Sequence, residues 1–252
     1  MRSSGPNAGP DWRFIHFGLI VTGETEERCL PDLFRSMAAT GRCSFSVIRR
    51  IGQRSPIRSD RRRLKMVGSG KMIPDRDVTE IGLPSRHYLS SETRYVVLID
   101  DLEAGRSDDH QDIYCRYRRA LDTILTPIQS RRASVHFLIN MLEAYYFADS
   151  RAVNTVLDAE LDDYEGDVET IRNPKDCMKT LHPGFDTVED GCRIIGSLAI
   201  PHVLSHRDAC TSLRTLFAWV YKAIGEPDCE LRQHLVGGYN DVTKGQICAL
   251  SP

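Results

Sequence analysis

Acidic side chains follow three apolar segments of the sequence, at the points where strands would end. Gly23-Glu24-Thr25-Glu26-Glu27 follows the first segment, Asp100-Asp101-Leu102-Glu103 ends the second, and Glu143 lies shortly after the third. Carboxylates at neighbouring parallel strand ends can converge on one ion. Their oxygens suit Mg²⁺ or Mn²⁺, which neutralises phosphate charge and activates water. We therefore predict a metal site and catalytic carboxylates from these groups: Asp100, Asp101, Glu103 and Glu143 as metal ligands, and Glu26, Asp101 and Glu143 in catalysis.

The same acidic groups also have a structural interpretation. Glu24, Glu26 and Glu27 would stabilise the N-terminus of a helix that follows the first strand. Asp100 and Asp101 are harder to explain in this way, because two adjacent carboxylates repel unless a cation or hydrogen-bond donors compensate.

The elements that must position these residues can be predicted from the apolar pattern. Strands are expected where short apolar, β-branched runs occur, at 13–22, 44–48, 94–100 and 134–139. Helices are expected between and after them, at 24–40, 108–125 and 141–149, with a kink or a delayed start at Pro31. Strands that alternate with helices predict an α/β, Rossmann-like, mostly parallel sheet flanked by helices.

The character of the sequence changes after residue 150. We expect a core at 11–150, a helical C-terminal portion at 151–225 packed on that core, and an irregular tail at 226–252. The helical portion should hold helices at 151–157, 175–181 and 207–224, whereas 193–200 is ambiguous.

Charge is strongly segregated along the chain. Between residues 49 and 76 there are ten basic and two acidic residues, and between 158 and 169 there are seven acidic residues and no basic one. The basic stretch predicts an inserted arm that binds phosphate; the alternatives are a solvated loop, or a loop that pairs with the acidic segment. The residues expected to contact nucleic-acid phosphates are Arg54, Arg58, Arg61, Arg62, Arg63, Lys65 and Lys71 in the arm, and Lys175 at a later helix start.

The overall composition excludes several protein classes. The 252 residues include 33 Lys and Arg against 35 Asp and Glu, a formal charge of −2, which excludes a uniformly basic nucleic-acid coat. No apolar run approaches the roughly 20 residues of a membrane span, and the N-terminus has no signal-peptide pattern. The cysteines are dispersed without zinc-ligand spacing. We expect a cytoplasmic protein with reduced thiols.

Together these motifs resemble the TOPRIM (topoisomerase–primase) fold, and within it the small TOPRIM-like proteins of bacterial genomes. The matching stretches are Leu19 to Glu27, Val97 to Glu103, Met141 to Asp149 and Asn173-Pro174-Lys175, so the resemblance covers roughly residues 13–225. It implies Mg²⁺-dependent phosphodiester cleavage or phosphoryl transfer, with DNA as the expected nucleic acid. It also implies antiphage defence beside an AAA- or ABC-type ATPase, and it is compatible with a homo-oligomer.

One residue departs from the family pattern. The first glutamate of the family, usually the general acid or base, corresponds to Thr22 here. Either Glu24, Glu26 or Glu143 takes its place, or the chain is a non-catalytic binding or regulatory subunit. A third alternative is a phosphohydrolase that acts on free nucleotides.

Overall fold

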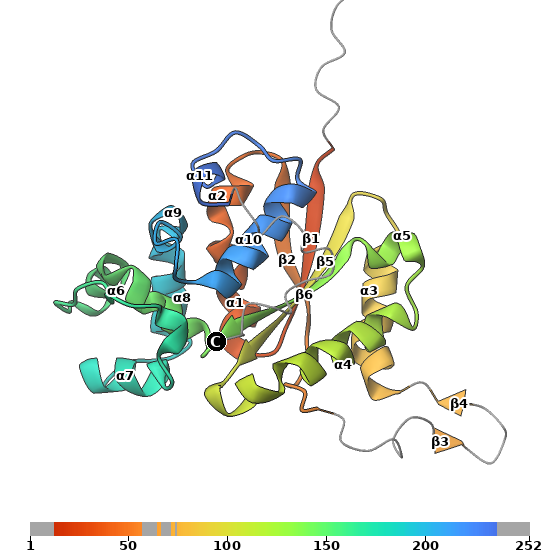
Figure 1. Ribbon diagram of the computed structural model, residues 1–252, viewed down its shortest axis with the longest axis horizontal. Coiled ribbons are helices and arrows are strands. Elements are labelled where there is room, and N and C mark those ends of the chain that lie inside the picture. Colours follow the sequence, from red (N-terminus) through yellow and green to blue (C-terminus); the bar gives the residue numbers. More distant parts are fainter. Residues whose placement is uncertain (1–12, 57–64, 67–71, 74, 236–252) are drawn as a thin grey trace, which may run out of the picture.

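The fold is built on four parallel strands, as the alternating pattern predicts. The computed structural model describes residues 13–56, 65–66, 72–73 and 75–235. The sheet has the order β2-β1-β5-β6, and each neighbouring pair is parallel (Figure 1). Its strands are β1 (Ile15–Val21), β2 (Cys43–Arg50), β5 (Arg94–Leu102) and β6 (Ala133–Ile139). The middles of the two central strands, Phe17–Val21 in β1 and Val96–Ile99 in β5, are buried on both faces, which explains why they are continuous runs without polar side chains.

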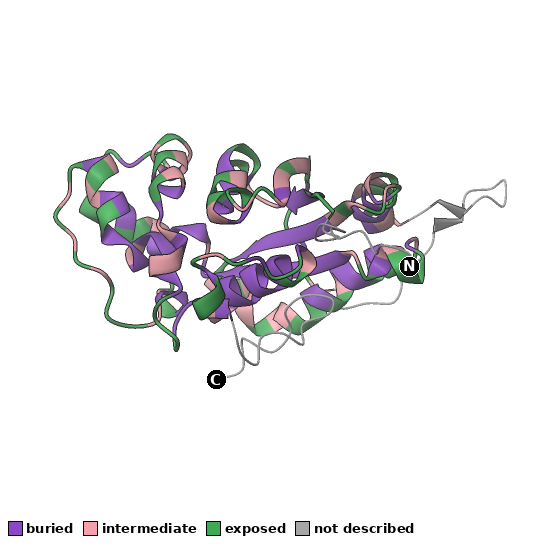
Figure 2. Cartoon of the chain, turned by 90° about the horizontal axis from the view of Figure 1, so that it is seen from above, coloured by how far each residue is buried: buried purple, intermediate pink, exposed green. Residues whose placement is uncertain are grey.

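Helices cover both faces of the sheet, so the buried strands lie between two outer layers (Figure 2). One layer is formed by α1 (Glu24–Leu33), α2 (Arg35–Ala38), α8 (Glu189–Ser197) and α10 (Thr211–Ala223). The other is formed by the π-helical turn η2 (Val78–Gly82), α3 (Leu83–Tyr88) and α4 (His110–Asp122). Alternate side chains of β1 show the division, because Leu19 belongs to the first core cluster and Ile20 to the second.

The remaining elements are short. Before residue 140 they are β3 (Lys65–Met66), β4 (Met72–Ile73), the 3₁₀ turn η3 (Ala104–Asp109) and α5 (Pro127–Ser130). After it they are the 3₁₀ helix η4 (Leu142–Ala148), α6 (Ser150–Leu157), η5 (Val168–Thr170), α7 (Pro174–Leu181), α9 (Ile200–Val203) and α11 (Arg232–Leu235). Between residues 150 and 235 every regular element is helical, and α10 packs into the same core as β1. None of the helices in the described ranges is long and apolar enough to cross a membrane.

Local structure differs from expectation in three places. The tail predicted to be irregular at 226–252 contains the short helix α11. The helix predicted at 24–40 begins at Glu24 without delay, but it ends at Leu33 and resumes as α2, because Phe34 leaves the helical region (φ −95°, ψ 15°). Pro31 removes a backbone donor just before this break. The helix predicted at 141–149 is a 3₁₀ helix that starts at Leu142.

Candidate metal and phosphate site

The sheet topology brings three chain segments together at one edge. The chain runs from β1 outward to β2 and then crosses back to β5 on the other side of β1, so ligands are expected at the carboxyl ends of β1 and β5. In the register, Val21 lies opposite Ile99, which places Thr22 beside Asp100. The next strand, β6, ends beside β5 and delivers Glu143 to the same edge.

Asp100 is held by donors on every side. Its fully buried carboxylate accepts hydrogen bonds from Thr22 Oγ1 (3.1 Å), from two Arg106 nitrogens (3.2 and 2.6 Å) and from Tyr117 OH (2.8 Å). Thr22 Oγ1 also accepts from the Asp101 amide at 3.2 Å. We call the donors Thr22, Arg106 and Tyr117 the Asp100 cage. They stabilise the negative charge of Asp100 next to Asp101. Asp100 therefore fastens β1, β5 and Arg106 together, and its role as a metal ligand stays a prediction.

Three other carboxylates, Glu26, Asp101 and Glu143, form what we call the acidic triad. Their residues are only 4%, 8% and 3% exposed. Burial, followed by repulsion from Glu26 and Glu143, raises the pKa of Asp101 well above its ordinary value. Burial also raises the pKa of Glu143. It raises the pKa of Glu26 to about 7, with smaller contributions from repulsion by Glu143 and Asp100. The triad thus concentrates negative charge where water stabilises it poorly.

The only described cation paired with the triad is Lys175. Its Nζ lies 3.8 Å from Glu143 Oε1, and its side chain remains 37% exposed. Lys175 stands in the first turn of α7, directly after Pro174, so its contact with Glu143 brings the start of this helix close to the triad. The predicted phosphate-binding lysine therefore lies next to the predicted metal ligands.

Gly23 makes room for the carboxylate of Glu26. A Cβ at Gly23 would lie 2.7 Å from Cδ and 2.8 Å from Oε1 of Glu26, and closer still to Oε2. The backbone of Gly23 is extended (φ −114°, ψ 168°), a conformation open to any residue. Glycine is thus required here for space and not for backbone freedom. It lets Glu26, in the first turn of α1, fold back over the chain toward the end of β1.

A strained turn positions Glu143. Asn140 and Met141 have positive φ values of 54° and 77°, and Met141 with ψ 160° occupies a region that normally requires glycine. The turn is held by the Asn140 side chain, which donates to Glu169 O at 2.6 Å, and by the Leu142 amide, which donates to Asp101 Oδ1 at 2.8 Å. The backbone strain therefore serves to bring the start of η4 against Asp101.

The remaining predicted metal ligand, Glu103, is exposed, although its charge still acts on Glu143. A different group of side chains has the closest spacing of possible metal ligands among the described residues: the ligand atoms of Asp149, Asp163 and His202 all lie within 4.8 Å of one another. The members of that group already have hydrogen-bond partners. His202 Nε2 lies 2.6 Å from Asp163 Oδ2, and backbone amides donate to the other oxygen of Asp163 and to one oxygen of Asp149. The oxygens of the acidic triad are more widely spaced, so a cation among them would be reached partly through water.

Arg54 is not placed where the sequence predicted. Its guanidinium is buried in ion pairs with Asp77 (2.7 Å) and Glu80, and it also donates to Gly52 O at 2.7 Å. Contact with a phosphate would break this network. The acidic partners lie 23 and 26 residues away in sequence, which local charge counting does not detect. Of the other arm residues, Lys65 lies in β3, and the rest lie outside the described residues: Arg58, Arg61, Arg62, Arg63 and Lys71.

The root of the basic arm is fastened directly to the site. Gln53 Nε2 donates to Asp101 O at 2.9 Å, and Arg106 Nη2 donates to Arg54 O at 2.7 Å. From α4, Arg116 Nη1 donates to Ser55 O at 2.6 Å. Sequence reasoning missed Gln53, Arg106 and Arg116; the only available signal was the position of Arg106, shortly after the Asp100-Asp101 pair. The chain thus enters the arm beside the acidic triad.

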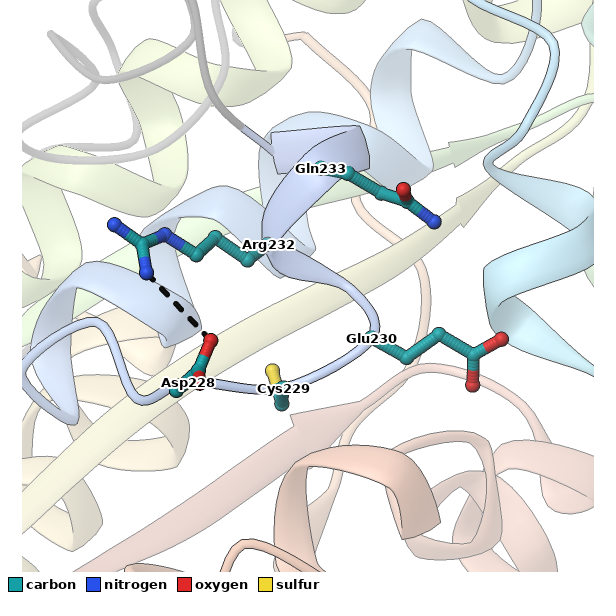
Figure 3. A pocket seen from close by; sticks show the side chains of 5 residues that line it. All are labelled: Asp228, Cys229, Glu230, Arg232 and Gln233. Carbon is teal, nitrogen blue, oxygen red and sulfur yellow. Dashed lines mark ion pairs between the residues drawn. The ribbon is translucent and has the colours of Figure 1, made fainter.

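A separate shallow pocket lies in the segment after α10 (Figure 3). It is lined by Asp228, Cys229, Glu230, Arg232 and Gln233, and Arg232 pairs with Asp228 at 3.5 Å. Arg42, just before β2, donates to Ile224 O at the end of α10, so this pocket lies toward the amino ends of the strands. It is remote from the acidic triad.

We expect the metal-free protein to lose stability as the pH rises from about 4.5 to about 7. The folded state holds a proton on Glu26 that the unfolded state releases, so ionisation opposes folding by on the order of 3 kcal/mol. Glu143 and Asp100 face this carboxyl and strengthen the effect, whereas Lys175 weakens it. Urea unfolding in EDTA at pH 5 and pH 8 measures the difference.

Two substitutions control this measurement. Glu26→Gln should reduce the pH dependence, whereas Glu24→Gln, at an exposed residue paired with Arg28, should leave it unchanged. A Glu26→Gln protein that follows the wild-type pH curve would show that Glu26 is not the titrating group.

The arrangement is suited to holding a cation next to a phosphate. It combines buried oxygen ligands, one lysine and a helix N-terminus at the edge where parallel sheets bind ligands. Comparisons with models of protein families, with curated proteins and with solved structures find no match to this chain.

Proposed function

We propose that this protein is a metal-dependent phosphoryl-transfer enzyme that cleaves nucleic-acid phosphodiesters at the acidic triad. The observation that carries the proposal is the burial of three mutually repelling carboxylates at the strand ends, with a lysine beside them. Such a cluster is unfavourable in the metal-free protein, and a divalent cation would remove the repulsion. Action in antiphage defence beside an ATPase rests on the family resemblance alone and is part of the same proposal.

The residues present fit Mg²⁺ or Mn²⁺. All three members of the triad offer hard carboxylate oxygens, and their spacing leaves room for the waters that Mg²⁺ usually retains. A second sign is Tyr146, a fully buried residue three positions after Glu143 whose hydroxyl has no hydrogen-bond partner among the described residues. Glu26, Asp101 and Glu143 would hold the cation, which supplies charge neutralisation and water activation when bound.

The chain's own groups cover the other requirements of the reaction. Glu26, a buried carboxylate of the triad, can accept the proton of an attacking water. Lys175 and the N-terminus of α7 can bind a phosphate oxygen. The Asp100 cage keeps β1 and β5 in register, and through Arg106 it fixes where the polymer-binding arm begins.

A binding or regulatory role is the second candidate, and Thr22 is the observation that favours it. Thr22 cannot act as an acid or base, and both of its described contacts are with Asp100 and Asp101 in β5. In that case the site would bind a cation or a phosphate without turnover.

The decisive test combines metal binding with cleavage. Mn²⁺ titration followed by EPR measures affinity, and labelled DNA, RNA and free nucleotides are incubated with Mg²⁺, Mn²⁺ or EDTA. We expect Mn²⁺ binding and EDTA-sensitive cleavage of a polymer. Binding without cleavage supports the regulatory role, cleavage of free nucleotides alone supports the nucleotide phosphohydrolase, and an absence of Mn²⁺ binding at millimolar concentration overturns the metal site.

A further inference from the structure

Two adjacent tyrosines in η4 have contrasting surroundings. Tyr145 and Tyr146 are both completely buried. Tyr145 OH donates to Glu169 Oε1 at 2.8 Å and accepts from the Ile139 amide at 3.3 Å. The hydroxyl of Tyr146 has no hydrogen-bond partner among the described residues. One phenol is therefore explained by the fold, and the other is not.

The unpartnered hydroxyl lies at the acidic triad. Tyr146 follows Glu143 by three residues in the 3₁₀ helix η4, so the two side chains project from the same face of that helix. The ionisable groups that act on its hydroxyl are Glu143, Cys29, Glu26 and Asp101, in that order. On its other side is Gly191 of α8, where an added Cβ would lie 3.1 Å from the hydroxyl and 3.4 Å from the Cγ2 of Thr25. A larger residue in α8 would press on this oxygen. Gly191 therefore leaves the space beside α8 that the Tyr146 hydroxyl occupies.

A buried hydroxyl without a partner costs free energy, because it has lost its hydrogen bonds to water. If Tyr146 served packing alone, a phenylalanine would supply the same ring without that cost. Native structures rarely leave such groups unsatisfied, and the exceptions point to a ligand or a water that completes them. The oxygen therefore requires an explanation that the apo fold does not provide.

We propose that Tyr146 is a positioning residue, whose hydroxyl donates a hydrogen bond to a water molecule held between the acidic triad and the substrate phosphate. The inference rests on the proposed function and deepens it, because it names the group that orients the attacking water. In the step, the oxygen of this water bonds to phosphorus while the bond from phosphorus to the leaving oxygen breaks. The proton of the water passes to a carboxylate of the triad and from there to the leaving oxygen, and Tyr146 keeps its own proton. The role is that of an outer-shell hydrogen bond, which typically contributes about 10- to 100-fold to activity or affinity at metal sites.

Tyr146→Phe tests this inference, with Tyr145→Phe as its matched control. Tyr146→Phe should fold with an unchanged or higher Tm and bind Mn²⁺ within about 3-fold of wild type, while its cleavage rate falls about 10- to 100-fold. Its Mn²⁺ EPR spectrum in ¹⁷O-labelled water should also change, a readout that needs no turnover. Tyr145→Phe should lower the Tm and leave that spectrum unchanged.

The possible failures are distinguishable. If wild type binds no Mn²⁺, the proposed function fails and the inference fails with it. If wild type binds Mn²⁺ and Tyr146→Phe matches it in spectrum and rate, the inference alone is overturned. A lower Tm for Tyr146→Phe would also overturn it, since it would mean that the hydroxyl already has a partner in the fold.

Discussion

Asp101→Asn is expected to lower metal-dependent cleavage by at least about 100-fold and to weaken Mn²⁺ binding to a similar degree. Asp101 is the member of the acidic triad at the end of β5, and burial together with the charges of Glu26 and Glu143 raises its pKa. The cation would be the partner that keeps this carboxylate ionised. An amide has nearly the same shape as a carboxylate but no charge. The substitution therefore removes the attraction of this residue for the cation and keeps an oxygen that can accept from the Leu142 amide.

The same substitution should make the metal-free protein more stable. Removing a buried charge from a cluster of like charges relieves repulsion and desolvation, so the Tm in EDTA should rise. Loss of function with a gain of stability is typical of a residue kept for chemistry. Thermal unfolding in EDTA measures the expected gain of stability, and Mn²⁺ titration measures the expected loss of metal affinity.

Asp108→Asn is the control, because Asp108 is an exposed carboxylate in the nearby turn η3. Asp108→Asn should change neither the Tm in EDTA nor the affinity for Mn²⁺. If Asp101→Asn cleaved as well as wild type, Asp101 would have no place in the active site, and the regulatory role would become the better interpretation.

The sheet and the neighbourhood of the site could be predicted because they follow from local patterns. The run that became β5 is apolar for five residues and then turns acidic, and that change marks both a buried strand and its carboxyl end. Once the sheet is parallel, the ends of β1, β5 and β6 must share one edge. This is why Glu26, Asp101 and Glu143 could be predicted from the sequence, whereas Lys175 was predicted only from the helix start at Asn173-Pro174.

The division of roles between Asp100 and Asp101 could not be predicted. It depends on Arg106 and Tyr117, which reach Asp100 only after α4 has packed on the sheet. The burial of Arg54 depends in the same way on distant carboxylates. Charge in a sequence window gives the number of ionic groups, whereas tertiary contacts decide which of them remain free.

The turn before Glu143 was hidden for a different reason. Positive φ is usually signalled by glycine, but this turn uses Asn140 and Met141. Tertiary hydrogen bonds from Asn140 and Leu142 hold the strained backbone. The residue types alone therefore did not predict a turn with positive φ. Only the structure shows that the turn before Glu143 is strained and that hydrogen bonds hold it in place.

Gly23→Ala should disable the site with little effect on the fold. The new methyl group would occupy the place of the Glu26 carboxylate, which must then swing away from the triad. The extended backbone of Gly23 accepts alanine, so the expected loss of stability is about 1 kcal/mol or less, that of a weaker N-cap. A carboxylate displaced by about 1 Å can cost roughly 100-fold in rate, and we expect a loss of that size in cleavage.

Gly105→Ala is the matched control, because a Cβ at Gly105 would meet nothing within 4 Å among the described residues beyond its own turn, and the residue lies in η3, just past the end of β5. It should retain wild-type cleavage and Mn²⁺ affinity. Combining Gly23→Ala with Glu26→Gln then separates space from charge. If the methyl group acts only by displacing Glu26, the double variant is no worse than Glu26→Gln alone. Additive losses would instead mean that Gly23 serves the site through its own backbone, at the N-terminus of α1.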